Sequence, residues 1–326
     1  MKENIADIPN TVEGYEPSLF MKNGHINTIY TSLLRKPSHP GYERVRIGTA
    51  DDDFLDVDWI KSGNKNLVVL CHGLEGNSGS QYMKGMSSHL SNLGFDIVAM
   101  NYRSCSGELN HQLTMYHSGA TGDLEEVLKV VHKGYEKIFL AGFSLGANLI
   151  LKYLGEKGSN LDYPIEAAAS ISVPADLKSS SHKIGAGFNR VYEIHFLISL
   201  QRRMRAKTRQ FPELATLAKK KKIRTLCDFD DVYTGPIHGF RDGNDYYEKC
   251  SSRNFIPEIK VPALIINALD DPFLTEACFP YKQVNENPFV EMLTPTFGGH
   301  VGFYKGRGQN CYQENVVGKY FLEGTI

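Results

Sequence analysis

One stretch, residues 138–154 (IFLAGFSLGANLILKYL), constrains the fold more than any other part of this 326-residue chain. Its first four residues are apolar and predict a buried strand, and the run after Gly146 predicts a helix that follows at once. Between them lies the pattern G-x-S-x-G, with Ser144 at its centre. A serine on so sharp a strand-to-helix turn adopts a strained backbone and presents its hydroxyl above a sheet, while the glycines let strand and helix approach closely. We therefore predict that Ser144 is a nucleophile.

The rest of the chain alternates between apolar strands and helices, which is typical of an α/β fold with a mostly parallel sheet flanked by helices. The first two strands are expected to form an antiparallel pair. The predicted strands are residues 44–47, 54–60, 67–70, 96–101, 138–141, 167–173, 261–266 and 289–293. The predicted helices on either side of the sheet are residues 83–93, 123–132 with Asp123 as its cap, 145–154 and about 310–322. Residues 1–40 contain four prolines and are expected to be irregular.

The alternation breaks between residues 176 and 255, where amphipathic runs at 190–204 and 212–220 predict helices. We predict one α/β domain over residues 1–326, with 176–255 inserted as a helical lid above the sheet. The inserted segment also carries a dense basic cluster: Arg202, Arg203, Arg205, Lys207, Arg209, residues 219–222 and Arg224. The cluster fits either a solvated helix face or a surface that attracts an anionic substrate, such as a phosphate-bearing lipid or a coenzyme A thioester.

Composition limits the partners of the protein. The net charge of −1 and the pI near 6.8 indicate no general attraction to nucleic acid or to an anionic membrane. No apolar run approaches the roughly 20 residues that span a bilayer, and the N-terminus lacks the apolar core of a signal peptide. The six cysteines are scattered without a C-x-x-C pair. We expect a cytoplasmic protein with reduced thiols and no transmembrane segment; the sequence does not reveal its oligomeric state.

A loop at residues 105–122 holds Cys105, His111 and His117, but their spacing is not that of a compact zinc motif. We therefore predict neither a metal nor a cofactor. His25 is expected to be a hydrogen-bonding loop residue.

An acid and a base follow Ser144 in the order expected for a hydrolase with this turn. Asp270 and Asp271 come after the strand at 261–266, and His300 follows two glycines after the last strand. A serine hydroxyl needs an adjacent base, which His300 supplies, and a carboxylate orients the imidazole. Only one of two neighbouring aspartates can face His300. Asp271, directly before Pro272, is favoured, and Asp270 is the alternative acid.

A glycine-bearing loop at residues 71–76 follows an early strand, where hydrolases of this architecture place half of the oxyanion hole. The backbone amide of Leu74 is expected to face the reacting carbonyl together with the amide of Leu145, which follows the nucleophile. His72 is expected to order this loop rather than to take part in the reaction.

Nine motifs together make the chain resemble the YheT-like branch of the α/β-hydrolase superfamily along nearly its whole length. They are NGH (23–25), HGLEGNSGS (72–80), NYRSCSGE (101–108), GFSLGANLILKYLGE (142–156), DFDDVYTGPIHGF (228–240), DYY (245–247), SS (251–252), DDPF (270–273) and GGHVGF (298–303). The resemblance implies an α/β-hydrolase fold, a triad of Ser144, one of the two aspartates and His300, and activity on carboxylic esters, including lipid and medium-chain acyl esters. Ala147 and Asn148 depart from the small residue pair that often follows the turn.

These observations predict a serine esterase that cleaves short-chain, medium-chain or lipid acyl esters through an acyl-enzyme. Its partner would be a small-molecule or lipid ester. Two alternatives remain open: an acyltransferase that uses the same triad with an alcohol in place of water, and a non-catalytic binding protein that keeps the fold.

Overall fold

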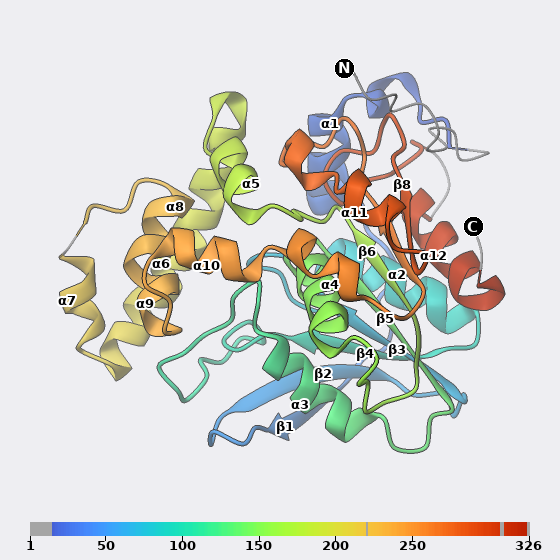
Figure 1. Ribbon diagram of the computed structural model, residues 1–326, viewed down its shortest axis with the longest axis horizontal. Helices are drawn as coiled ribbons and strands as arrows, with labels where there is room; N and C mark the ends of the chain where they lie inside the picture. Colours follow the sequence, from blue (N-terminus) through green and yellow to red (C-terminus); the bar gives the residue numbers. More distant parts are fainter. Residues whose placement is uncertain (1–14, 220, 307–309, 325–326) are drawn as a thin grey trace.

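An eight-stranded sheet with the order β1-β2-β4-β3-β5-β6-β7-β8 forms the centre of the computed structural model, which describes residues 15–219, 221–306 and 310–324 (Figure 1). β1 pairs antiparallel with β2 and β2 with β4, whereas all the other pairs are parallel. The predicted mostly parallel sheet with an antiparallel first pair is therefore confirmed. The strands are β1 Glu43–Gly48, β2 Phe54–Ile60, β3 Asn66–Cys71, β4 Asp96–Asn101, β5 Lys137–Phe143, β6 Ile165–Ile171, β7 Ala263–Ile266 and β8 Val290–Leu293.

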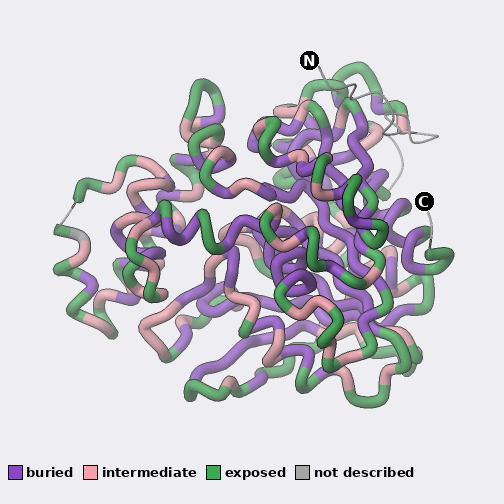
Figure 2. Tube along the Cα trace, in the orientation of Figure 1, coloured by how far each residue is buried: buried purple, intermediate pink, exposed green. Residues whose placement is uncertain are grey.

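Helices cover both faces of the sheet, which explains why its central strands are apolar without alternation. In β3, Leu67 and Val69 pack into one hydrophobic core while Val68 and Leu70 pack into the other. Figure 2 shows these strands as a buried centre. Helices α3 and α4 contribute to the first core, and α2 and α12 to the second. The helices around the sheet are α2 Gln81–Asn92, α3 Thr121–Val131, α4 Leu145–Lys157, α11 Tyr281–Asn285 and α12 Tyr312–Glu323.

In the sequence, a block of helices is inserted between β6 and β7, which are neighbours in the sheet. This block lies at the left of Figure 1. It has a core of its own, in which Leu197, Met204 and Phe229 pack with Met115 from the loop after β4. The block consists of α5 Leu177–Ile184, α6 Arg190–Gln210, α7 Leu214–Ala218, α8 Leu226–Phe229, α9 Gly235–Ile237 and α10 Gly243–Cys250. Short helical turns complete the chain: η1 Leu19–Lys22, η2 Tyr30–Leu34, η3 Gly187–Asn189, η4 Asp230–Thr234, η5 Ser252–Asn254, η6 Ile256–Glu258 and η7 Glu276–Cys278. Across the described ranges, no helix combines the length and apolar character that crossing a membrane requires.

The expectation of an irregular N-terminal segment is wrong for residues 19–34. Helix α1 (Gly24–Ile29) lies there between η1 and η2. The Asn23 side chain caps α1 by accepting a hydrogen bond from the amide of Ile26 (3.1 Å), and Pro17 and Pro37 lie outside the helical region. Residues 1–14, which belong to the same expectation, lie outside the described residues.

The prediction that Asp123 caps the second helix is also wrong. α3 begins at Thr121, so Asp123 lies inside the first turn. Its carboxylate instead pairs with the Arg103 guanidinium (2.8 Å), which also binds Asp53 (2.8 Å). A buried arginine that needs several acceptors takes precedence over a local cap, because leaving that charge without partners would be far more costly.

Candidate active site

Ser144 stands alone between β5 and α4, in a backbone conformation of φ 54° and ψ −114°. A positive φ is unfavourable for a residue with a Cβ, so the surrounding structure must hold it. The Ser144 amide donates to the carbonyl of Ile171 in β6 (2.8 Å), and its carbonyl accepts from the amide of Asn148 in α4 (3.0 Å). The turn thus raises the hydroxyl at the carboxyl end of the parallel strands.

The two glycines of the turn let α4 approach the sheet. A methyl group on Gly142 would lie 2.5 Å from the carbonyl oxygen of Gly146, and one on Gly146 would overlap the backbone carbonyl of Cys71 in β3. Neither neighbour can move easily, because both are backbone atoms in regular structure.

We expect Gly146→Ala to lower the free energy of unfolding by about 1–3 kcal/mol, since the added methyl must displace backbone. Urea denaturation measures this loss. Gly122→Ala is the matched control, because nothing lies within 4 Å of the added methyl on α3. Equal stabilities of the two variants would contradict the close approach of α4 to β3.

His300 lies between the serine and one of the two aspartates. Its Nε2 is 2.9 Å from Ser144 Oγ, and its Nδ1 is 2.9 Å from Asp271 Oδ2 and 3.1 Å from Oδ1. The amide of Phe273 donates to Asp271 Oδ1 (2.8 Å), and the Phe273 ring lies 4.3 Å from the imidazole centroid. The three side chains therefore form a continuous hydrogen-bonded row, shielded on one side by an aromatic ring.

Asp270 has a different position. Its Oδ1 accepts a hydrogen bond from the amide of Gly299 (2.8 Å), and its buried Oδ2 has no hydrogen-bond partner in the described part of the chain. Burial raises the pKa of Asp270 to about 6. The structure brings Asp271 to His300, whereas Asp270 holds the glycine loop that precedes the histidine.

Sequence reasoning missed a residue that supports this histidine. The Thr28 hydroxyl accepts a hydrogen bond from the backbone amide of His300 (2.8 Å) and donates to the carbonyl of Gly24 (2.6 Å). Nearby, His25 hydrogen-bonds the Tyr192 hydroxyl of α6 (3.1 Å). The NGH motif at 23–25 pointed to this segment, but no sequence pattern indicated that α1 packs against a loop 272 residues away.

The amides of Leu74 and Leu145 form no hydrogen bond within the part of the chain that the structure describes, and both residues line one cavity with Ser144 and His300. His72 orders the loop, since its Nδ1 lies 2.7 Å from the carbonyl oxygen of Gly73 and its Nε2 accepts from the amide of Tyr102 (3.2 Å). Burial lowers the pKa of His72 to about 4, so the ring is neutral. Two amides without partners are thus available near the serine.

Glu75 connects the same loop to the inserted helices. Its side chain, only 5 % exposed, accepts hydrogen bonds from the Tyr116 hydroxyl (2.7 Å) and, on α6, from the Ser199 hydroxyl and Arg203 (3.0 Å). Its own backbone has a strained φ of 56°. Because Glu75 directly follows Leu74, the position of α6 and that of the Leu74 amide are physically coupled.

Two residues of the basic cluster, Arg203 and Lys207, form contacts that fit neither a solvated helix face nor an anion-attracting surface. Arg203 pairs with Glu75, and the buried Lys207 ammonium donates to the backbone carbonyls of Asn110 (2.7 Å) and Gln112. These two side chains join the insertion to the sheet domain, so they belong neither to a solvated face nor to a surface that attracts anions.

On the ester substrates that the sequence predicts, we expect Glu75→Gln to lower kcat about tenfold, with a smaller change in KM, because an amide cannot accept from all three donors and the Leu74 loop loses its anchor. Steady-state kinetics on a soluble ester measure the effect. Glu126→Gln, the same change at a residue of α3 that does not line the cavity with Ser144, is the control. A loss confined to KM would instead indicate a role in substrate binding only.

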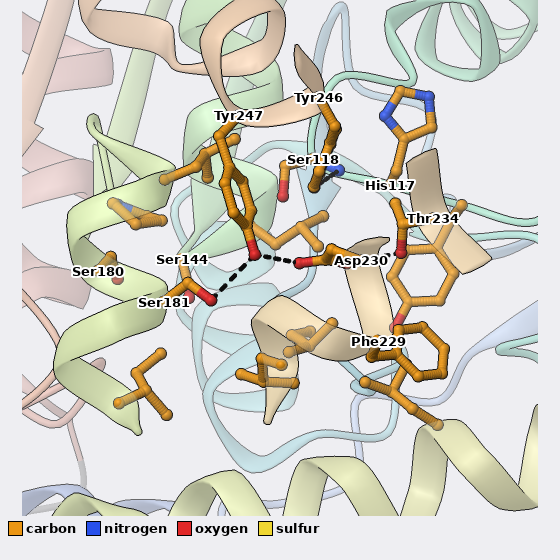
Figure 3. A pocket seen from close by; sticks show the side chains of 18 of the residues that line it. His117, Ser118, Ser144, Ser180, Ser181, Phe229, Asp230, Thr234, Tyr246 and Tyr247 are labelled. Carbon is orange, nitrogen blue, oxygen red and sulfur yellow. Dashed lines mark hydrogen bonds between the residues drawn. The ribbon is translucent and has the colours of Figure 1, made fainter. Parts of the chain in front are cut away.

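Ser144 and His300 line a cavity of about 110 Å³ between the sheet domain and the inserted helices. Figure 3 shows this cavity from close by. Most of its wall is apolar, and Figure 3 labels a polar group of side chains from α5, η4 and α10. The apolar residues include Leu74, Leu145, Leu177, Leu200, Met204 and Phe229. Among the described residues, no group of three or more histidine, cysteine or acidic side chains has the arrangement of a metal site.

The model of the alpha/beta hydrolase fold family matches residues 66–303. This range is more than half of the chain and contains Ser144, Asp271 and His300. The chain belongs to the α/β-hydrolase family. Within that family, this α/β-hydrolase is 34% identical to YheT of Escherichia coli over 300 residues, which cover 89% of this chain and 87% of YheT. The predicted YheT-like membership is therefore confirmed.

Other relatives of this α/β-hydrolase have names that state an activity. A monoacylglycerol lipase of Saccharomyces cerevisiae is 31% identical, with 81% of this chain and 60% of that protein covered. The phospholipase ABHD3 of Mus musculus is 28% identical, with 98% and 80% covered. Among solved structures, the Pyrococcus furiosus esterase Pf2001 superposes with a TM-score of 0.57 at 18% identity, over 86% of this chain and 92% of that one. At that identity the match supports the fold alone.

Proposed function

We propose that this protein is a serine hydrolase of carboxylic esters, with Ser144 as nucleophile, His300 as general base and acid, and Asp271 as the orienting carboxylate. The observation that carries the proposal is the row of contacts: 2.9 Å from Ser144 Oγ to His300 Nε2, and 2.9 Å from His300 Nδ1 to Asp271. The names of the relatives, a monoacylglycerol lipase and a phospholipase, support esters as the substrate class.

The proposed reaction starts with proton transfer. Asp271 holds the proton of His300 on Nδ1, so the Nε2 lone pair faces the Ser144 hydroxyl. Ser144 Oγ attacks the acyl carbonyl while His300 takes its proton. His300 then returns that proton to the departing alcohol, which leaves an acyl-enzyme. Water, deprotonated by the same imidazole, releases the acid and restores the serine.

Negative charge on the carbonyl oxygen needs donors that are already in place. We propose the amides of Leu74 and Leu145 for this role, because both line the cavity beside Ser144 and have no partner among the described residues. The positive end of α4, which begins at Leu145, adds to the stabilisation. Loss of one such donor typically lowers the rate about 100- to 1000-fold.

The insertion at residues 176–255, whose helices span residues 177–250, is proposed to act as the lid of one domain that spans residues 1–326. Leu200 and Met204 of α6 and Phe229 of α8 line the cavity, so the insertion covers the serine and encloses part of the substrate. An apolar wall of this kind suits the hydrocarbon part of an acyl ester.

Reaction with a fluorophosphonate tests the proposal. Intact mass is expected to show a single adduct on the wild-type protein, and nitrophenyl esters of graded chain length are expected to be hydrolysed. A folded protein that forms no adduct and cleaves no ester would overturn the proposal and favour a binding protein with this fold.

A further inference from the structure

A carboxylate, Asp230 of η4, lines the same cavity as Ser144 and His300 (Figure 3). Burial raises the pKa of Asp230 to about 6. Among the ion pairs of the described residues none includes Asp230, whereas Asp228 and Asp231 both pair with Lys221. A carboxylate buried without a cation is unfavourable unless hydrogen-bond donors surround it.

Among the described residues, two such donors contact Asp230, and both are neutral hydroxyls. Thr234 donates to Asp230 Oδ1 (2.6 Å) and Tyr247 of α10 donates to Oδ2 (2.5 Å), while the Tyr247 hydroxyl also shares a hydrogen bond with Ser181 of α5 (3.1 Å). Figure 3 shows this row of dashed contacts, and all four residues line the cavity. A carboxylate has about four acceptor directions, so acceptor capacity is left over after these two bonds.

A hydrocarbon substituent would bind in this cavity without the Asp230 carboxylate. Leucine, methionine and phenylalanine side chains form most of its wall and would hold a hydrocarbon chain unaided. A purely hydrocarbon substituent would instead displace water from Asp230 and leave the carboxylate short of donors. Sites built to bind a polar group discriminate strongly against analogues that lack it, for this reason.

We propose that Asp230, positioned by Thr234 and Tyr247, is a specificity subsite for a hydrogen-bond donor on the substrate: a hydroxyl or ammonium group carried by the substituent of the ester that fills the cavity. The proposal rests on the proposed function, because it concerns the ester that Ser144 attacks. It narrows the substrate class from acyl esters in general to esters with a polar group at a distance from the carbonyl.

The test compares kcat/KM for three matched series of nitrophenyl esters over a range of acyl lengths, ending in methyl, hydroxyl or ammonium. A second set of simple esters carries the same methyl, hydroxyl or ammonium group at the end of the alcohol part, because either substituent of the ester could fill the cavity. For the wild type, we expect at least one acyl length at which kcat/KM for an ester with a hydroxyl or ammonium end exceeds that for the ester with a methyl end by about tenfold or more. Preference for the ammonium ester over the hydroxyl ester would identify a cationic group, and the reverse a neutral one.

Asp230→Asn is expected to reduce that preference to within about threefold, because an amide is a weaker acceptor and carries no charge. Asp231→Asn is the matched control: Asp231 lies next in sequence, pairs with Lys221 and is not part of the cavity wall, so the wild-type preference should persist. An unchanged preference in Asp230→Asn would overturn the proposal.

Two further outcomes keep the subsite and the proposed function separable. A wild-type protein that favours the methyl ester at every length would overturn the subsite, even if Asp230→Asn does not fold. Formation of the fluorophosphonate adduct in the same samples shows that the serine is active. Ester cleavage without donor preference would therefore refute only the subsite, whereas no adduct and no cleavage would refute the proposed function.

Discussion

Replacement of Ser144 by alanine is expected to lower kcat for ester hydrolysis by at least about ten-thousandfold. His300 would have no hydroxyl to deprotonate, and only binding and the oxyanion donors would remain. The fold should be retained, because the hydroxyl's contact in the described structure is with His300, and alanine carries the same Cβ through the strained φ of 54°. Kinetics on a nitrophenyl ester and intact mass after fluorophosphonate treatment measure the loss.

Ser87→Ala is the matched control for this variant. Ser87 lies on α2, and its hydroxyl bonds to Tyr42 (2.6 Å) rather than to any residue of the cavity. Its kcat should stay close to the wild-type value. Hydrolysis by Ser144→Ala within tenfold of the wild type, with the melting temperature unchanged, would show that another group is the nucleophile.

The second large effect separates the two neighbouring aspartates. Asp271→Asn is expected to lower kcat about ten-thousandfold while leaving the geometry intact. The new amide would donate to His300 Nδ1, so the remaining proton would move to Nε2 and point at Ser144 Oγ, which His300 then cannot deprotonate. Substrate KM should change little, because Asp271 lies behind the imidazole and does not line the cavity.

Asp270→Asn is the matched control for Asp271→Asn, because it makes the same substitution at the neighbouring aspartate. Asp270 binds the Gly299 amide, which an asparagine oxygen can still do, so kcat should stay within a few-fold of the wild type. Its raised pKa means that the folded state holds the Asp270 proton more tightly than the unfolded chain, and this contribution to stability is lost as pH rises towards about 6. Above that pH the variant should therefore gain stability relative to the wild type, on the order of 1 kcal/mol after allowance for partial exposure. Similar losses of kcat in both variants would contradict the assignment of Asp271.

Residues that act through local geometry were predictable from the sequence. The turn around Ser144 depends on a strand, two glycines and a helix that are contiguous in the chain, so short-range pattern was sufficient to locate it. The order of serine, acid and histidine then pointed to His300 and to the pair at 270–271. The apolar strands likewise predicted a sheet covered on both faces, because strands without alternation must be buried on both sides.

The sequence favoured Asp271 over Asp270, but only the tertiary structure shows which of the two carboxylates contacts His300. Consecutive side chains point in different directions, and which of them meets the imidazole depends on how the turn after β7 packs against the glycine loop before His300. The support of His300 by Thr28 and the contact of Glu75 with α6 join segments that are distant in the chain. Neither motif by itself indicates its partner, because hydrogen bonds of this kind leave no periodicity in the sequence.

The chemical character of the cavity shows most clearly the difference between what the sequence and the tertiary structure determine. The sequence by itself determined the sharp turn at Ser144 and the mostly parallel sheet, since each follows from residues close together in the chain. Only the tertiary structure placed Asp230 in the wall of the cavity beside Ser144. Three segments, around α5, η4 and α10, must fold over the sheet before that carboxylate, its hydroxyl donors and the serine share one space, and burial in that space is what changes the chemistry of the carboxylate.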